Sequence, residues 1–340
     1  MQSRKTCDRK CTTESKRHSG DRRDGKSDMS AAYRSRQGRR REQIVKGLAA
    51  PQKARWIEAV GQGERTGQGE AAGQREPASH QGQADGGGPE PVVSVIIPVY
   101  NGERFLSQAV DSALAQQVPL EILVINDCST DNTERVMERY RENPAVRYLV
   151  NEKNLGAGGS RNRGVKLAKG TYVAFLDADD WWAEGKLKKQ LERLEETGMA
   201  LCCTGRELMD ENGVSMGRVI PVPEVITYRR LLSHNCINCS STVLRREAAL
   251  EFPMEHEDSH EDYIAWLRLL KKYGCACGVN EPLLKYRLSG KGKSGSKLKS
   301  AGMTFRVYRY MGFGWGQSLL CFVSYALHGV WKYRRGTGKK

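Results

Sequence analysis

The chain has 340 residues, and its 55 Lys and Arg against 40 Asp and Glu give a formal net charge of +15. The excess lies at the two ends: residues 1–90 carry a net +7, residues 91–284 a net −5 and residues 285–340 a net +13. An acidic middle argues against a globular nucleic-acid-binding domain, whose own surface should carry the basic patch. No apolar run approaches the ~20 residues of a membrane-spanning helix, and none follows the charged start as in a secretory signal. We therefore expect a cytoplasmic protein.

Residues 1–90 are predicted to form a disordered basic tail. Gln, Gly, Arg and Glu dominate this stretch, and its apolar residues are too few to build a core. The composition changes abruptly at Pro91, which suggests that the tail is dispensable or that translation starts downstream of it. Basic tails of this kind can still meet phosphates or an anionic membrane surface.

From residue 91 onward, strand-like and helix-like segments alternate. The strand-like segments share continuous apolar, β-branched runs, which are typical of strands buried on both faces. They are residues 92–100, 120–126, 146–150 and 172–176. The helix-like segments between them are residues 105–114, 133–140 and 161–168. The alternation predicts an α/β fold with a mostly parallel, Rossmann-like sheet flanked by helices, and ligands bind such sheets beyond the carboxyl ends of the strands.

Three carboxylates follow the fourth predicted strand, at Asp177, Asp179 and Asp180. Like charges this close repel one another unless a cation joins them. The spacing therefore suits a hard divalent metal ion that shares its coordination with phosphate oxygens. The alternative is an acidic loop in which Asp180 caps a helix that begins near Trp181.

A glycine-rich turn, residues 156–159, precedes the predicted helix over 161–168. Glycines permit close approach of the backbone, and the N-terminus of a helix favours phosphate. The glycine spacing matches neither the dinucleotide-binding nor the P-loop fingerprint, which argues against an NAD-dependent enzyme and a P-loop NTPase. Arg161 is a candidate for binding diphosphate charge, or it is an ordinary surface arginine.

The ten cysteines are expected to be buried thiols, because a reducing compartment disfavours a disulfide framework. The alternative is a zinc site made by Cys236 and Cys239 with Cys275 and Cys277. Cys-x-Cys is a poor chelating pair and both pairs lie among apolar residues, so buried thiols are favoured.

Four motifs, in this order, resemble the family 2 glycosyltransferases, which are inverting enzymes with the GT-A fold. They are VSVIIPVYNGERF, EILVINDCSTDNT, NLGAGGSRNRG with FLDADDWW, and HEDYIAWL. The resemblance covers residues 92–300 and implies a GT-A domain that begins near residue 91. It also implies a glycosyltransferase that needs Mn²⁺ or Mg²⁺ and moves a sugar from a nucleotide diphosphate, with UDP expected, to an acceptor hydroxyl. The chain lacks the Gln-x-x-Arg-Trp stretch of processive synthases, so a non-processive enzyme is expected.

The resemblance also assigns roles to single residues. Asp262 matches the catalytic base; its alternative is an ordinary first-turn acid at a helix N-terminus. Asp179 matches the direct metal ligand, and Asp177 is expected near both the metal and the ribose. The residues implied in binding the nucleotide sugar are Pro98, Tyr100, Asn101, Asp127, Gly156, Arg161, Asp177 and Arg287. Cys128 departs from the family's usual glycine, but the base-contacting acid, Asp127, is retained.

The C-terminal part is expected to hold a flexible loop and a basic extension. Tyr286 and Arg287, followed by serines and lysines, resemble a loop that closes over the diphosphate; a merely solvated loop is the alternative. Residues 301–340 are predicted to be a basic amphipathic extension. Its helix, over 317–333, places Leu320, Val323 and Leu327, with Val330, on one face. We expect this face to lie on an anionic membrane surface, the alternative being packing on the catalytic domain or a second subunit.

The expected function is that of an inverting glycosyltransferase in surface polysaccharide or lipid-linked glycan synthesis, peripheral on the cytosolic face of the membrane. The expected partners are a nucleotide-diphosphate sugar and a glycan or lipid-linked acceptor, with no nucleic acid. The alternative is a non-catalytic protein that binds nucleotide or nucleic acid through its basic tails. The three retained acids Asp177, Asp179 and Asp262 favour the enzyme.

Overall fold

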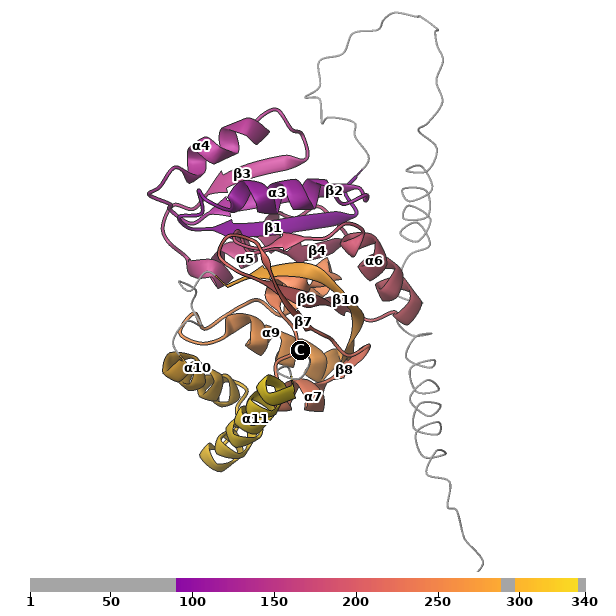
Figure 1. Cartoon of the computed structure of the whole chain (residues 1–340), viewed down its shortest axis with the longest axis vertical. Helices are drawn as coiled ribbons and strands as arrows, with labels where there is room; N and C mark the ends of the chain where they lie inside the picture. Colours follow the sequence, from indigo (N-terminus) through magenta and orange to yellow (C-terminus); the bar gives the residue numbers. More distant parts are fainter. Residues whose placement is uncertain (1–89, 289–296, 336–340) are drawn as a thin grey trace, which may run out of the picture. The chain divides into compact units, whose positions relative to one another are not determined.

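The computed structural model describes residues 90–288 and 297–335, with side chains for residues 90–288 and 299–327. The predicted tail lies outside the described residues except for Glu90, and so does most of the predicted closing loop. In the described part, one mixed sheet has the strand order β3-β2-β1-β4-β9-β6-β10-β5, while β7 pairs with β6 and β8 with β10 (Figure 1). The predicted α/β sheet flanked by helices is therefore confirmed, but it is a mixed sheet rather than a mostly parallel one, because β5, β7, β8 and β9 pair antiparallel.

The sheet has a parallel half and a mixed half. The parallel half consists of β1 (Val93–Val99), β2 (Leu120–Asn126), β3 (Val146–Val150) and β4 (Tyr172–Phe175). The mixed half consists of β5 (Trp181–Trp182), β6 (Leu201–Met209), β7 (Ser215–Ile220), β8 (Val225–Thr227), β9 (Val243–Arg245) and β10 (Cys275–Arg287). In the mixed half, β10 runs parallel to β6, whereas β9 is antiparallel to both β4 and β6.

The helices in the parallel half are α3 (Leu106–Leu114), α4 (Thr133–Met137) with the 3₁₀ turn Glu138–Tyr140, and α5 (Gly156–Leu167). Those in the rest of the chain are α6 (Lys186–Thr197), α7 (Tyr228–Ser233), the 3₁₀ turn Cys239–Ser241, α8 (Arg246–Glu251), α9 (Glu261–Tyr273), α10 (Lys297–Tyr310) and α11 (Trp315–Arg335). The central strands are buried because helices cover them, and residues such as Ile96, Leu123 and Val173 have no exposed surface.

Two local predictions are wrong. The glycine-rich segment does not precede its helix but forms its first turn, because α5 already begins at Gly156. Trp181 begins a strand rather than a helix: β5 pairs with β10, with Trp182 opposite Leu284, and α6 begins only at Lys186. Both errors arise from contacts with segments about a hundred residues away, which local periodicity does not report.

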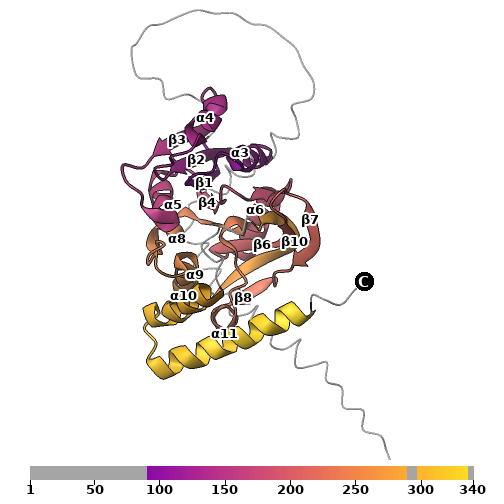
Figure 2. The same ribbon diagram turned by 60° about the vertical axis from the view of Figure 1, so that its left-hand side comes forward.

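The C-terminal helices pack on the domain that holds α9. The buried side chains Met303, Val307 and Tyr308 of α10 face it, and α11 contacts α7 and α10 (Figure 2). The predicted amphipathic helix is thus present as α11, preceded by a helix that was not predicted. No helix among the described residues has the length and apolar character needed to cross a membrane.

Candidate active site

Three neighbouring strands of the parallel half end at one edge of the sheet. Val99 at the end of β1 lies opposite Asn126 at the end of β2, and Ile96 lies opposite Phe175 of β4. The Asp127 amide continues this ladder by donating to the Val99 carbonyl at 2.8 Å. The loops that follow these strands carry the predicted donor-binding residues, so the structure brings them to a common rim.

Asp127 is fixed by the loop that leads into α5. Its carboxylate is buried, and its Oδ1 atom accepts hydrogen bonds from the Asn151 side chain at 2.6 Å and from the Leu155 amide at 2.7 Å. The Asn154 side chain donates to the Asp127 carbonyl at 3.1 Å. Cys128, where glycine is usual, takes a positive φ of 63° and so keeps the turn that aims Asp127. These contacts hold the carboxylate in one orientation before any ligand arrives.

The loop after β1 is fastened to the loop after β2. Asn101 has a φ of 52°, and its side-chain oxygen accepts a hydrogen bond from the Thr130 backbone amide at 2.8 Å. The backbone amide of Asn101 donates to the Ser129 hydroxyl at 2.9 Å. Tyr100 remains 56% exposed, so its ring is available at the rim for a planar group. Pro98 lies within β1, opposite Ile125, and shapes the start of this loop.

The acidic loop lies beside this rim. The Asp177 amide donates to the Ser240 hydroxyl at 3.1 Å, and the Asp177 carboxylate accepts from Arg161. Asp180 is almost fully buried and accepts from the Arg287 amide at 3.0 Å. The expected alternative, in which Asp180 caps a helix starting near Trp181, is wrong because that segment is a strand.

The charge of this loop fits a cation. Burial, and then the charges of Asp179 and Asp177, raise the pKa of the Asp180 carboxyl well above its ordinary value. Carboxyl groups this close repel one another when they are ionised, and a bound cation would relieve that repulsion. Carboxylate oxygens are also the ligands that hard divalent ions prefer. Among the described residues no three His, Cys, Asp or Glu side chains are grouped as a metal cage. Asp179 and Asp177 are the residues that would hold an ion here.

Arg287 has a different place from the one expected. It ends strand β10 rather than belonging to a flexible loop, and only 4% of it is exposed. Its guanidinium donates to the Asp179 carbonyl at 2.9 Å and to the Gln108 side chain at 2.6 Å. The rings of Phe105 and Trp181 lie over it, with centroids 4.1 Å and 4.8 Å from its Cζ atom. In this arrangement the Arg287 guanidinium is held by groups of the protein and contacts the backbone of the acidic loop.

Asp262 lies in the first turn of α9, as the sequence indicated. Its Oδ1 atom accepts from the Tyr263 amide at 2.7 Å. Burial, followed by the charge of Glu261, raises the pKa of Asp262 to about 7, while Arg161 acts in the opposite direction. A carboxylate whose pKa lies near neutrality can accept a proton and release it again within the physiological range.

Arg161 joins the acidic loop to α9. One guanidinium nitrogen contacts Asp177 at 2.5 Å and the other contacts Glu261 at 3.3 Å, with only 7% of the Arg161 side chain exposed. It is therefore not the surface arginine considered as an alternative. Neither partner contact could be deduced from the sequence, and Glu261 was not among the predicted site residues.

The N-terminus of α5 was expected to receive a phosphate, but a carboxylate of this chain occupies it. The Gly158 amide donates to Glu257 at 2.6 Å, and a Cβ atom placed on Gly156 would lie 2.5 Å from the Glu257 carboxyl carbon. The glycines thus provide room for an acid from the segment before α9. Gly156 therefore lies against the Glu257 carboxylate.

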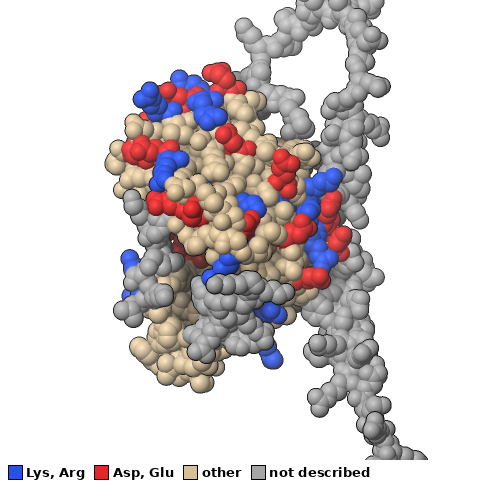
Figure 3. All heavy atoms as spheres, viewed as in Figure 1, with Lys and Arg blue, Asp and Glu red and all other residues tan. Residues whose placement is uncertain are grey.

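Two further predictions concern the cysteines and the surface charge. The expectation of buried thiols is confirmed for five cysteines, Cys202, Cys203, Cys239, Cys275 and Cys277, whereas Cys128, Cys236 and Cys321 are free thiols that are only partly buried. Cys7 and Cys11 lie outside the described residues. On the face shown in Figure 3, Lys and Arg side chains are interspersed with Asp and Glu.

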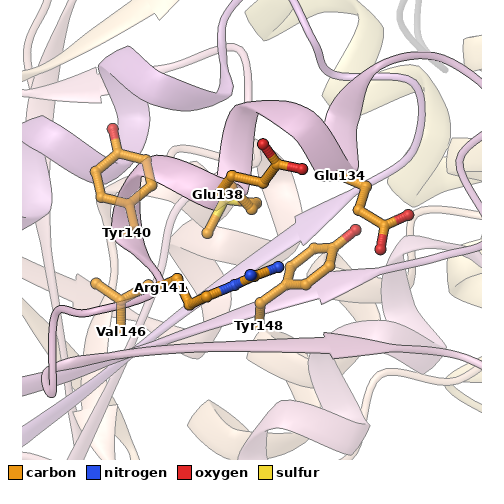
Figure 4. A pocket seen from close by; sticks show the side chains of 7 residues that line it. Glu134, Glu138, Tyr140, Arg141, Val146 and Tyr148 are labelled. Carbon is orange, nitrogen blue, oxygen red and sulfur yellow. The ribbon is translucent and has the colours of Figure 1, made fainter.

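A separate hollow of about 240 Å³ lies at the β3 edge of the sheet. Figure 4 shows Tyr148, Glu134, Glu138 and Arg141 around it. None of the predicted site residues lines this hollow, so it is distinct from the rim that carries them.

Comparison with known proteins agrees with this geometry. The model of the family described as "Glycosyl transferase family 2" matches residues 94–252. The chain is 38% identical over 251 residues to the putative teichuronic acid biosynthesis glycosyltransferase TuaG of Bacillus subtilis, covering 72% of this chain and 98% of that protein. This chain belongs to glycosyl transferase family 2. It is therefore a glycosyltransferase, and the resemblance drawn from its motifs is confirmed.

A second relative is the Escherichia coli UDP-Glc:alpha-D-GlcNAc-diphosphoundecaprenol beta-1,3-glucosyltransferase WfgD, 35% identical over 214 residues, which are 61% of this chain and 81% of WfgD. Among solved structures, S. aureus TarS 1-349 in complex with UDP-GlcNAc has a TM-score of 0.53 at 20% identity, over 64% of this chain and 65% of TarS. The Pyrobaculum calidifontis mannosyltransferase PcManGT, in complex with GDP-Man and Mn²⁺, also has a TM-score of 0.53, at 17% identity over 80% of this chain and 76% of that one. These structures confirm the GT-A fold.

Proposed function

We propose that this family 2 enzyme transfers a sugar from a UDP-sugar, with inversion, to a hydroxyl of a lipid-linked or polysaccharide acceptor. The observation that carries the proposal is one rim on which Asp127, the acidic loop and Asp262 meet, with Arg161 bridging the last two. WfgD, which uses UDP-Glc on a diphosphoundecaprenol-linked sugar, and TuaG, named for teichuronic acid synthesis, support this class of donor and acceptor.

On this proposal, the donor base lies between Tyr100 and Asp127. The fixed Asp127 carboxylate accepts the imide N–H of uracil, and the exposed Tyr100 ring packs on the base. Pro98 and Asn101 hold the loop that carries Tyr100. Because these groups are already hydrogen-bonded in place, little conformational entropy is lost when the base binds.

The acidic loop receives the diphosphate. Asp179 and Asp177 are the residues that would hold a divalent ion, Mn²⁺ or Mg²⁺, and such an ion would supply Lewis-acid stabilisation of negative charge on the leaving diphosphate. Arg287 keeps the Asp179 carbonyl and the Asp180 carboxylate in place from the protein side. Gly156 supports this part of the site by letting the segment before α9 approach α5.

Asp262 takes the proton. In inversion the acceptor hydroxyl attacks the anomeric carbon from the side opposite the diphosphate, the C–O bond to the diphosphate breaks, and the hydroxyl proton passes to Asp262. A positioned general base of this kind contributes about 10²–10⁴-fold to the rate. Since the pKa of Asp262 is about 7, the basic form predominates only above neutral pH, and the rate should fall as the pH drops through that value.

We also propose that α11 rests on an anionic lipid surface. Its row of exposed apolar side chains consists of Trp315, Leu319, Leu320, Val323 and Leu327, and these are 47–73% exposed. The opposite face packs on the protein, with the Tyr325 ring 6.2 Å from that of Tyr263. The guanidinium of Arg309 stands 5.0 Å over the Trp315 ring, so the row begins beside positive charge. A helix with one face anchored and one apolar face exposed suits the lipid interface, where a lipid-linked acceptor is found.

The direct test is a panel of UDP-, GDP- and CDP-sugars incubated with the full chain and Mn²⁺, with release of the nucleoside diphosphate measured; cytosine lacks the imide N–H that Asp127 accepts. We expect turnover with a UDP-sugar and loss of turnover when EDTA removes the metal. Equal turnover with all three nucleotides would contradict the role of Asp127, and turnover unaffected by EDTA would contradict the metal role of Asp179.

A further inference from the structure

Arg161 and Glu261 are buried charges that lie between the acidic loop and the first turn of α9. Glu261 is 5% exposed and Arg161 is 6% exposed, and their side chains approach to 3.3 Å. A buried ion pair costs desolvation of both charges, so its presence calls for a reason other than stability alone. The second contact of the Arg161 guanidinium, to Asp177, connects this ion pair to the acidic loop.

The glycine-rich first turn of α5 makes this contact sterically possible. A Cβ atom placed on Gly158 would lie 2.9 Å from Cγ of Glu261 and 2.7 Å from Oε1 of Glu257. Any side chain at this position would therefore push α9 away from α5. This close packing is independent of the charges, and it gives the glycines a function that the phosphate hypothesis did not supply.

We propose that Arg161 and Glu261 form a positioning pair that fixes the first turn of α9 against the acidic loop and thereby aims Asp262 at the acceptor hydroxyl. The inference rests on the proposed role of Asp262 as the base. Arg161 is then a positioning residue that acts through two carboxylates, rather than a ligand of the nucleotide. The same guanidinium holds Asp177 on the donor side and Glu261 on the acceptor side, so it sets the spacing between leaving group and base.

The pair also controls the charge around Asp262. The charged groups that face this carboxyl are Glu261 from its own helix, Arg161 from α5 and Asp177 from the acidic loop, with the Cys239 thiol nearby. Removing the negative charge of Glu261 should lower the pKa of Asp262, whereas removing the positive charge of Arg161 should raise it. Opposite shifts from two partners of one ion pair are a signature that general destabilisation does not produce.

The experiment measures kcat, the KM for the UDP-sugar and the acid limb of the pH–rate profile for Glu261→Gln, Arg161→Gln and Arg161→Lys. We expect kcat to fall about 10- to 100-fold in the two glutamine variants, because small displacements of a catalytic group have effects of that size. The acid limb should move to lower pH in Glu261→Gln and to higher pH in Arg161→Gln. Arg161→Lys keeps the positive charge, so its acid limb should lie at the wild-type pH and its kcat should lie between those of Arg161→Gln and the wild type. In all three variants the KM for the UDP-sugar should stay within about threefold of the wild-type value.

Glu121→Gln is the matched control. Glu121 is also a buried acid in an ion pair, with Arg147 at 3.1 Å, but it lies at the start of β2, away from the carboxyl ends of the strands. It should lower the melting temperature without moving the acid limb. If Arg161→Gln does not fold, the comparison of Glu261→Gln and Arg161→Lys with this control still tests the positioning role of the pair.

Three results would overturn the inference. The first is an unchanged acid limb in folded Glu261→Gln, and the second is a similar kcat loss in Glu121→Gln. The third is a raised donor KM with normal kcat in Arg161→Lys, which would make Arg161 a donor ligand. Asp262→Asn separates this inference from the proposed function: an active Asp262→Asn variant refutes the base itself, whereas an inactive one beside a normal Glu261→Gln refutes only the positioning pair.

Discussion

The parallel half of the sheet and the region around α9 hold their polar groups in different ways. In the parallel half, Asp127 and Asn101 are fixed mainly by hydrogen bonds from loop amides and side chains. Around α9, Arg161, Glu261 and Asp262 are charged groups in a largely buried environment. Hydrogen bonds to a charged group contribute about 1.5–3 kcal/mol, whereas removing one partner of a buried ion pair costs about 3–5 kcal/mol.

This difference indicates how each region works. The hydrogen-bonded rim can hold a nucleotide without a change in charge, so substitutions there should alter donor affinity. The charged region must accept a proton during the reaction, so substitutions there should alter the rate and its pH dependence. Four variants, from the largest expected effect to the smallest, test this division.

The largest effect is expected for Asp262→Asn. The amide cannot accept the hydroxyl proton, so kcat should fall by about 10²–10⁴-fold while UDP affinity is unchanged. Transfer assays and UDP titration calorimetry measure the two quantities. Glu255→Gln, a change to a half-exposed acid that pairs with Arg268, serves as the control and should keep wild-type kcat.

Asp262→Asn should also change stability with pH. The pKa of Asp262 is raised in the folded protein, so this carboxyl stabilises the fold at low pH, and that contribution is lost as the pH rises through about 7. At pH 8 the asparagine variant should therefore melt at a higher temperature than the wild type, and this advantage should shrink as the pH falls below 7 and disappear near the ordinary value of 3.8. A melting-temperature difference that does not vary with pH would contradict the raised pKa.

Asp179→Asn tests the metal site between the two regions. Loss of a charged ligand should weaken Mn²⁺ binding, and with it the several kcal/mol of charge stabilisation that a bound metal supplies. Activity measured against Mn²⁺ concentration should shift to higher metal concentration, with a lower maximum. Asp210→Asn, in the β6–β7 turn, is the control. An identical metal dependence in Asp179→Asn and wild type would exclude Asp179 as a ligand.

Asp127→Asn should act on the donor rather than on the rate. Replacing one charge-assisted hydrogen bond of about 1.5–3 kcal/mol should raise the KM for the UDP-sugar about 10- to 100-fold, with kcat nearly unchanged. Asn151 also depends on this carboxylate, so a melting curve should accompany the kinetics. A large fall in kcat at normal KM would contradict the assignment of Asp127 to donor binding.

The smallest effect on kcat is expected for the double substitution Leu320→Asp and Val323→Asp on α11. Both side chains are exposed, so the fold should remain intact, but two charges should abolish sedimentation with vesicles of phosphatidylglycerol. Turnover with a water-soluble acceptor should stay within about twofold, as expected for exposed positions that touch no substrate. Leu250→Asp, at an exposed leucine on α8, is the control for a charge added outside α11. Vesicle binding retained by the double variant would refute the lipid-facing role of α11.

Much of the parallel half was predictable because its strands are buried on both faces. The predicted bounds of β2 and β3 agree with the structure, and β1 and β4 differ from prediction by a residue or two. The positions of Asp127 and Asp177 follow from the same pattern, since they come directly after apolar runs. The loops after parallel strands meet at one edge, so their common rim could be predicted as well.

The sequence by itself determined the family, the parallel half and the acids that follow its strands, because continuous apolar runs and short motifs are local properties. Only the tertiary structure decided that Trp181 begins a strand, that Arg287 is buried behind the acidic loop, and that Arg161 contacts Glu261. These facts depend on partners about a hundred residues away. Local periodicity shows that a side chain is buried, but which distant charge compensates it is settled only when the chain folds.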